Sequence, residues 1–180
     1  MEGSLIIMKN ETAMKAFIAN LGKYNDGELV GKWVEPAGLD ADDWKEILES
    51  IGADEAHEYF IPDYEYAPDF LGEYESLEHV TEVADVVDEY GLDLFNAVYD
   101  SIGDFEQTRD ILDDGDYVVY DAADDEELGE CLVDEGLLGE IPARLSNYID
   151  YEAIGRDFAI ETCGSFETID NRTQFVEVVD

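Results

Sequence analysis

Aspartate and glutamate are the residues of this sequence that could most readily act in acid–base catalysis or bind a metal, but they are too numerous to single out a catalytic pair. The 180 residues include 48 acids, nine Lys and Arg, two His and two Cys. Acid–base catalysis needs one specific pair of groups within reach of a substrate, so a choice among so many carries almost no information. No Gly-rich phosphate loop, GxSxG or HExxH motif is present, and His57 and His79 are isolated. We therefore expect no catalytic residue, no cofactor and no enzyme activity.

The nearest metal-binding pattern is a calcium loop in DILDDGDYVVYD, from Asp110 to Asp121. Asp110, Asp114 and Gly115 match the first, fifth and sixth positions of such a loop. Leu112 stands at a coordinating position, however, and Asp121 replaces the Glu that usually closes the loop. The pattern therefore predicts no specific metal site, only the weak and diffuse cation binding of a polyanion.

Net charge is the outstanding property of the chain. The formal charge is −39 and the sequence pI is about 4.1. A charge of this size repels nucleic acid and anionic membrane surfaces, so neither is expected as a direct ligand. The partners to expect are basic proteins, cations, or proteins that normally bind polyanions. Hydrophobic residues make up 46% of the chain and aromatic residues 12%, which is enough for a packed core.

The sequence favours a cytoplasmic location. Cys131 and Cys163 lie far apart and form no CxxC motif, as is typical of two reduced thiols in a cytosolic protein. The apolar run at residues 5–8 is too short for a secretory leader, and no run approaches the length of a membrane span. Residues 1–14 include alternative start methionines and are predicted to be a dispensable N-terminal extension.

The few cations are unevenly distributed. All five lysines fall in the first quarter of the chain, and Arg109 is the only formal cation between Glu46 and Ala143. The same stretch holds 32 of the 48 acids. Protein surfaces normally mix both signs, because mixing neutralises neighbouring charges at little cost. A single acidic run is ordinarily a solvated face, but about a hundred residues with one base call for another explanation.

Carboxylates at helical spacing define a candidate interaction surface. Like charges one turn apart destabilise a helix by roughly 0.2–0.5 kcal/mol per pair, so repeated acidic stripes are not neutral for folding. Carboxylates on successive turns, about 5–6 Å apart, are suitably spaced to imitate phosphates. We call the following set the acidic surface: Asp63, Glu65, Asp69, Glu73, Glu75, Glu78, Glu82, Asp85, Glu89, Asp113, Asp114, Asp124, Glu126, Glu127, Glu130 and Asp134.

The first secondary-structure elements predicted to position these carboxylates are the strands of a small sheet. Residues 16–21 and 30–35 are predicted strands, connected through a turn at 25–27. Residues 58–65 are a third predicted strand, which Pro62 and Pro68 should confine to an edge or a short run. In this third strand the aromatic and aliphatic side chains should face inward and hold the carboxylates outward.

Four helices are predicted from apolar residues that recur on one face. The first should begin at an Asp40 cap and end at Gly52, with an inward face of Trp44, Ile47, Leu48 and Ile51. The next three share residues 76–115, and each ends at a glycine suited to a tight C-cap, namely Gly91, Gly103 and Gly115. The first of the three should bury Leu77, Val80, Val83, Ala84 and Val87.

The last third of the chain is predicted to mix helix and strand. Residues 117–120 should form a short strand, and 122–136 a helix. Residues 141–158 should contain a helical turn or two. Strands are then expected at 158–162, 165–169 and 174–179, with a turn at Asn171-Arg172.

These elements predict an α+β protein built as an elongated chain of three small domains, with small antiparallel sheets at both ends and short helices in the middle. The predicted boundaries are 15–74, 75–115 and 116–180 after the extension at 1–14. Duplex DNA carries one charge per roughly 1.7 Å, so the net charge matches about twenty base pairs, or some 65 Å. A single globule of this length would be only about 40 Å across, which favours an elongated arrangement.

Three stretches of the sequence resemble the ArdA antirestriction protein family. They are FIANLGKYNDGELVGKWV, then EYFIPDYE with EYESL after a gap, and then GLLGEIPARLSNYIDYEAIGRDF. They follow in family order and at family-like spacing, and the third is the most specific. Its matching residues are Glu140, Ile141, Pro142, Tyr148, Ile149, Asp150, Tyr151, Glu152, Arg156 and Asp157. The extension at 1–14 departs from the family pattern, which begins close to the first strand.

The resemblance implies a non-enzymatic DNA mimic. Members of this family are elongated, acidic, three-domain proteins that pair through their C-terminal regions. They occupy the DNA-binding groove of type I restriction–modification enzymes, at the specificity and modification subunits, and block restriction and often modification. Conjugative elements and phages carry them into the cytoplasm of bacterial hosts. The matching motif residues could serve the fold and the dimer as well as target contact.

Two other function classes remain open from the residues. A cation-binding or buffering protein would be stabilised by millimolar calcium at fixed ionic strength, although its calcium loop fails at coordinating positions. A protein adapted to high salt would unfold in low salt and need no particular partner. Within the DNA-mimic class, the target could also be another DNA-binding or host-defence enzyme.

Overall fold

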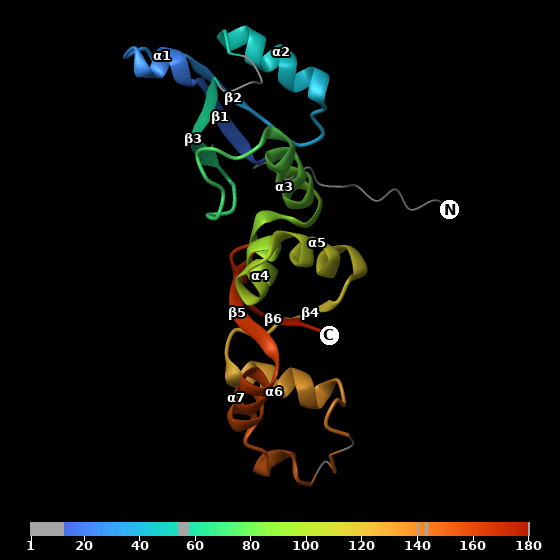
Figure 1. Ribbon diagram of the computed structural model, residues 1–180. Helices are drawn as coiled ribbons and strands as arrows, with labels where there is room; N and C mark the ends of the chain where they lie inside the picture. Colours follow the sequence, from blue (N-terminus) through green and yellow to red (C-terminus); the bar gives the residue numbers. More distant parts are fainter. Residues whose placement is uncertain (1–12, 54–57, 140, 143, 180) are drawn as a thin grey trace, which may run out of the picture. The chain divides into compact units, whose positions relative to one another are not determined.

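The computed structural model describes residues 13–53, 58–139, 141–142 and 144–179 (Figure 1). The chain divides after Leu92 into two compact units, which are described separately below. Within the described residues, seven α-helices accompany two three-stranded antiparallel sheets, one near each end of the chain. This confirms the predicted α+β class. None of the described helices combines the length and hydrophobicity that crossing a lipid bilayer requires.

The first unit is built on a sheet with strand order β2-β1-β3. Its strands are β1 (Lys15–Asn20), β2 (Gly31–Val34) and β3 (Tyr59–Glu65). The central strand β1 buries Ala16 and Ile18 completely, whereas β3 lies at an edge and its Pro62 is exposed. Of the two alternatives predicted for this strand, an edge or a short run, the structure shows the edge position.

The connection between β1 and β2 differs from the simple turn that was predicted, because it begins with a short helix, α1 (Leu21–Asn25). The buried side chain of Asn20 caps this helix by accepting a hydrogen bond from Lys23 N at 2.9 Å. Its amide also donates to Gly52 O at 2.7 Å. Of the predicted turn residues, Asn25 is the last residue of this helix, and Gly27 adopts a left-handed conformation (φ 89°).

Helix α2 (Ala41–Ile51) follows its sequence signals closely. Asp40 accepts hydrogen bonds from Asp42 N and Asp43 N, and the Asp43 side chain accepts one from Asp40 N, which completes a capping box. Gly52 ends the helix in the left-handed conformation. The buried residues are Trp44, Leu48 and Ile51, three of the four that were predicted to face inward.

Helix α3 (Leu77–Tyr90) completes the first unit, and its whole predicted apolar stripe is buried. Ser76 caps its start by accepting a hydrogen bond from His79 N at 3.1 Å. The indole of Trp44 on α2 donates to Thr81 Oγ1 on α3 at 2.9 Å, which ties the two helices together.

The second unit contains two short helices, a second sheet and a helix pair. Helices α4 (Leu92–Ile102) and α5 (Phe105–Asp114) each precede a glycine with positive φ, as predicted. The sheet order is β4-β6-β5, with β4 (Tyr117–Tyr120), β5 (Cys163–Ile169) and β6 (Arg172–Val178). The helix pair is α6 (Asp125–Asp134) and α7 (Tyr151–Glu161), and the short 3₁₀ helix η1 (Ser146–Tyr148) lies between them in sequence.

The predicted strand at 158–162 is wrong, because most of it lies in the last turns of α7. Its aromatic and β-branched residues look strand-like, but Phe158 packs as a helical residue against the rings of Tyr120 and Phe175. The two strands after it are confirmed. Their turn is shifted one residue earlier than predicted, since Asp170 and Asn171 adopt the positive φ angles of a tight hairpin.

Helices α6 and α7 cross at two glycines, Gly129 and Gly155. A Cβ added at Gly129 would lie 2.0 Å from Tyr151 O, and one added at Gly155 would lie 1.9 Å from Asp125 O. Because both obstacles are backbone atoms, only glycine allows the helices to approach this closely. The crossing covers a core formed by Tyr120, Ala122, Leu128, Leu132 and Phe175.

Candidate interaction surface

The acidic surface predicted from the sequence is exposed. Of its sixteen carboxylates, only Glu75 is half-buried and all others are exposed. The residues from Asp63 to Glu89 belong to the first unit, and those from Asp113 to Asp134 to the second. Among the residues that the structure describes, no three His, Cys, Asp or Glu side chains are grouped so that they could hold a metal ion. These carboxylates thus present charge to solvent within each unit.

Two acids on β3 already have partners. Glu65 Oε2 lies 3.5 Å from Lys15 Nζ on the neighbouring strand. Asp63 Oδ1 accepts a hydrogen bond from Tyr64 N at 3.0 Å. An exposed ion pair of this kind contributes little to stability, but it lowers the local negative charge. Glu65 is therefore a weaker member of the acidic surface than its exposure suggests.

Tyrosines hold the acidic segment that follows β3. The Tyr64 hydroxyl donates to Gly72 O at 2.9 Å, and the Tyr59 hydroxyl donates to Glu75 O at 3.3 Å. Ile61 N also donates to Glu73 O at 2.8 Å. Burial raises the pKa of both tyrosines above the ordinary value for this side chain. The aromatic residues thus fix the chain that carries Glu73 and Glu75, as the sequence suggested.

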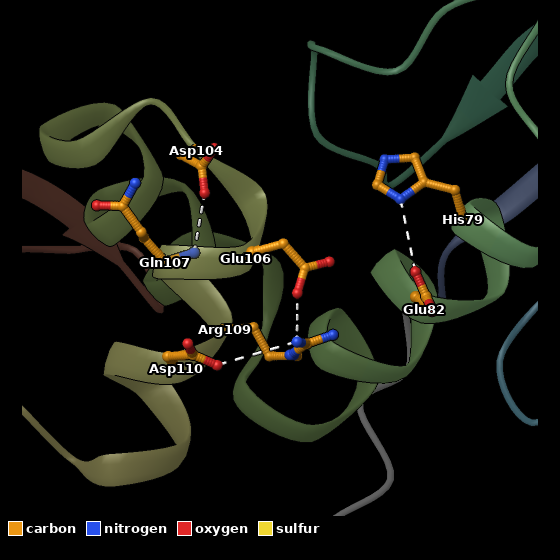
Figure 2. Close-up of polar contacts among 7 residues, drawn as sticks. All are labelled: His79, Glu82, Asp104, Glu106, Gln107, Arg109 and Asp110. Carbon is orange, nitrogen blue, oxygen red and sulfur yellow. Dashed lines mark hydrogen bonds and ion pairs between the residues drawn. The ribbon is translucent and has the colours of Figure 1, made fainter.

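The acids of α3 form the predicted stripe opposite the buried valines, but they are not equivalent. Glu82 Oε2 lies 3.8 Å from His79 Nδ1 one turn earlier (Figure 2). Asp85 Oδ1 accepts a hydrogen bond from Gly38 N at 2.6 Å, which anchors the loop before α2. The sequence gives no sign of this second contact, because the two residues lie 47 positions apart. Asp85 therefore combines surface charge with a structural role.

Arg109, the lone cation of the long acidic stretch, is paired within its own helix. Its guanidinium contacts Glu106 and lies 3.9 Å from Asp110, both on α5 (Figure 2). It also lies 5.8 Å from the centre of the Phe105 ring. Neighbouring acids therefore cancel its charge locally, and Asp113 and Asp114 on the same helix stay exposed.

The acids of α6 divide into capping and free residues. Asp124 caps the helix by accepting a hydrogen bond from Glu127 N at 3.0 Å, and Glu127 Oε2 accepts one from Ala123 N at 2.8 Å. Negative charge at a helix N-terminus is favourable, because it interacts with the helix dipole. The other members of the acidic surface on this helix, Glu126, Glu130 and Asp134, are exposed.

Three residues of the third resembling stretch make contacts at α7. Asp150 Oδ1 caps α7 by accepting a hydrogen bond from Ala153 N at 3.1 Å, and Arg156 lies 3.6 Å from Asp157. Glu140 lies outside the described residues. Pro142, Tyr148 and Glu152 are exposed, whereas Ile141, Ile149 and Tyr151 are half-buried.

Gly155 was missed by the sequence reasoning, although it lies within this same stretch. The available signal was a glycine inside a helical pattern, where it costs stability unless close packing requires it. The sequence also offered no sign that five apolar side chains of the second unit are exposed; they are Leu137, Leu138, Leu145, Tyr148 and Ile160.

Comparison with known proteins identifies the family. The model of the ArdA antirestriction protein family matches residues 16–171, which is most of the chain. A search of curated proteins found no significant match. The matched region includes every residue of the acidic surface. On this evidence, the chain belongs to the ArdA family of antirestriction proteins.

Proposed function

We propose that this protein inhibits type I restriction–modification enzymes without catalysis, by mimicking B-form DNA in their DNA-binding groove. The observation that carries the proposal is the exposed acidic surface. Arg109, the one cation in the sequence between Glu46 and Ala143, is paired with acids of its own helix. The carboxylates stand in for phosphates, and caps, tyrosine hydroxyls and a glycine crossing hold their backbone in place. The target contacts are then the specificity and modification subunits, which bind DNA.

The acidic surface should act through the same counterion physics as DNA. A basic groove that binds a polyanion releases the counterions condensed on it, so binding weakens steeply as salt rises. Inhibition should therefore fall between about 50 and 200 mM salt, in parallel with the enzyme's own affinity for DNA. The cytoplasm of a bacterial host is the corresponding proposed location.

The decisive experiment measures competition between this protein and labelled DNA that is already bound to the enzyme. The protein is titrated against a type I enzyme in low salt, and DNA release, restriction and methylation are measured together. Release of DNA is expected as the protein reaches equimolar amounts, with loss of restriction. The methylation arm decides whether modification is blocked too. If the DNA stays bound at a tenfold molar excess, the proposal is wrong.

A charge-reversal variant tests whether the acidic stripe on α3 is responsible for inhibition of the enzyme. Glu78, Glu82 and Glu89 are replaced by Lys, and Asp85 is kept because it bonds Gly38 N. Inhibition should weaken, while stability is preserved or slightly raised because the positive side chains at positions 82 and 89 would each lie one turn from the retained Asp85 and attract it. The matched control reverses three exposed acids outside the acidic surface, Glu28, Glu35 and Glu49. Equal loss in both variants would mean that only total charge matters.

We also propose that two protomers pair through their C-terminal regions. Five exposed apolar side chains of the second unit support this: Leu137, Leu138, Leu145, Tyr148 and Ile160. Tyr148 is 85% exposed, so its aromatic ring has a large apolar area that an interface could bury. Light scattering of the wild type should give a dimer, and Tyr148→Asp should shift it toward monomer. The elongated three-domain arrangement stays a prediction, for which solution scattering is the test.

A further inference from the structure

A groove in the first unit has features that phosphate mimicry alone does not require. It has a volume of about 740 Å³ and lies at the N-terminal turns of α2 and α3. Leu39, Trp44 and Leu77 supply apolar surface, and the carboxylates of Asp40, Glu78 and Glu82 line it as well. No Lys or Arg contributes to the lining. The groove therefore combines apolar surface with negative charge.

The three carboxylates differ in the hydrogen bonds and ion pairs that they already make. Asp40 accepts hydrogen bonds from two backbone amides of α2, and Glu82 lies beside His79. Glu78 is exposed in the first turn of α3, and the described part of the chain gives it no hydrogen bond or ion pair. Glu78 and Glu82 are one helical turn apart, so their Cβ atoms are separated by about 5–6 Å. One planar cation could bond both.

We propose that this groove receives an arginine side chain from the partner protein. Arginine combines an apolar stem with a planar, permanently charged head that can bond carboxylates through several N–H groups. Its stem would pack against Leu39 and Leu77, and its guanidinium would bond Glu78 and Glu82. Lysine fits less well, because its charge is a compact point that cannot bridge two carboxylates in one plane.

This inference rests on the proposed function, since DNA-binding grooves contact phosphates largely through Arg and Lys. An arginine that normally reaches a phosphate would meet a carboxylate pair beside an apolar wall. A DNA backbone offers the arginine stem the edges of its sugars, but no groove lined by leucine side chains. The groove would thus give the protein a contact that DNA lacks, in addition to its matching charge.

The test uses a capped Gly-Arg-Gly peptide and the two tryptophans of the chain. The indole N–H signals of Trp44 and Trp33 are followed by NMR in the wild-type protein at low salt, and Trp33→Phe assigns them. We expect the Trp44 signal to shift saturably, because Trp44 lines the groove. The Trp33 signal should stay unchanged. The matched peptide with citrulline, which lacks the charge, should leave both signals in place.

Two variants separate the groove from diffuse charge. Glu78→Gln should weaken peptide binding at least threefold, whereas Glu89→Gln, an exposed acid on the same helix outside the groove, should leave it unchanged. Ala41→Phe fills the groove without changing the charge and should abolish binding. Equal effects of the two Gln variants, or a Trp44 shift with the citrulline peptide, would overturn the inference.

The same variants distinguish failure of the groove from failure of the proposed function. Ala41→Phe should weaken inhibition of the type I enzyme several-fold, although the net charge is unchanged. A wild-type protein that inhibits the enzyme but does not bind the peptide overturns the groove and leaves the DNA mimic intact. A protein that binds the peptide but does not inhibit supports the groove and rejects the proposed target.

Discussion

Replacing Gly155 by Ala should destabilise the second unit, although the same change stabilises most helices. Alanine is normally favoured over glycine inside a helix by about 1 kcal/mol. Here the new Cβ would lie 1.9 Å from Asp125 O and 2.9 Å from Gly129 N. Ordinary contact begins at 3.4 Å, so α7 would have to withdraw from α6 by about 1.5 Å, the difference between the two distances.

The size of the effect follows from what the crossing covers. Overpacking costs typically 1–3 kcal/mol, and because backbone atoms cannot rotate away we place this clash at about 3 kcal/mol. Subtracting the helical gain of about 1 kcal/mol leaves a net loss of about 2 kcal/mol. For a unit of this size, such a loss lowers the melting temperature by about 8–16 °C.

Thermal unfolding measured by circular dichroism, with hydrogen exchange to assign the change to α6 and α7, provides the assay. Gly22→Ala on α1 is the matched control, because its Cβ would meet only Asn20 Oδ1 at 3.4 Å, an ordinary contact. That variant should melt within a few degrees of the wild type. A Gly155→Ala protein as stable as the wild type would refute the close crossing.

Two further predictions concern single side chains. Asp85→Ala should lower the free energy of unfolding by about 0.5–1.5 kcal/mol, because Gly38 N loses its hydrogen-bond acceptor. Glu89→Ala should change it by less than about 0.5 kcal/mol. Urea unfolding of the two variants measures the difference. Burial and the hydrogen bond to Glu177 raise the pKa of Tyr120 to about 12. The unfolded chain loses this proton near pH 10, so stability should fall as the pH rises from about 10 to 12. Unfolding measured at several alkaline pH values should show a smaller fall for Tyr120→Phe, and an unchanged fall would contradict the assignment.

Local signals explain the parts of the fold that were predicted correctly. The ends of α2 are specified by Asp40 and Gly52, which act within one turn of the helix. The buried stripe of α3 follows from residues three and four apart, which share a helix face whatever the tertiary structure. The exposure of the acids on α3 was predictable for the same reason, since they lie opposite the stripe.

Features that depend on residues distant in sequence could not be predicted. Gly129 and Gly155 meet only because α6 and α7 pack together, and neither residue signals a partner by itself. The contact between Asp85 and Gly38 N likewise depends on how the loop before α2 folds back on α3. Phe158 was assigned to a strand because its local sequence favours one, but packing against Tyr120 decided the outcome. Tertiary contacts therefore determine which acids are free for a partner.

The aspartate caps have a practical consequence for engineering. Asp40, Asp104, Asp124 and Asp150 each start a helix by accepting backbone hydrogen bonds. Asparagine is about as effective as aspartate in that position, because the side-chain oxygen is what caps the helix. Exchanging all four would change the net charge from −39 to −35 while keeping the caps. Asp124 belongs to the acidic surface and Asp40 lines the groove of the first unit, whereas Asp104 and Asp150 belong to neither. Comparing the two pairs on one scaffold would separate the effect of total charge from the effect of charge at the proposed binding surfaces.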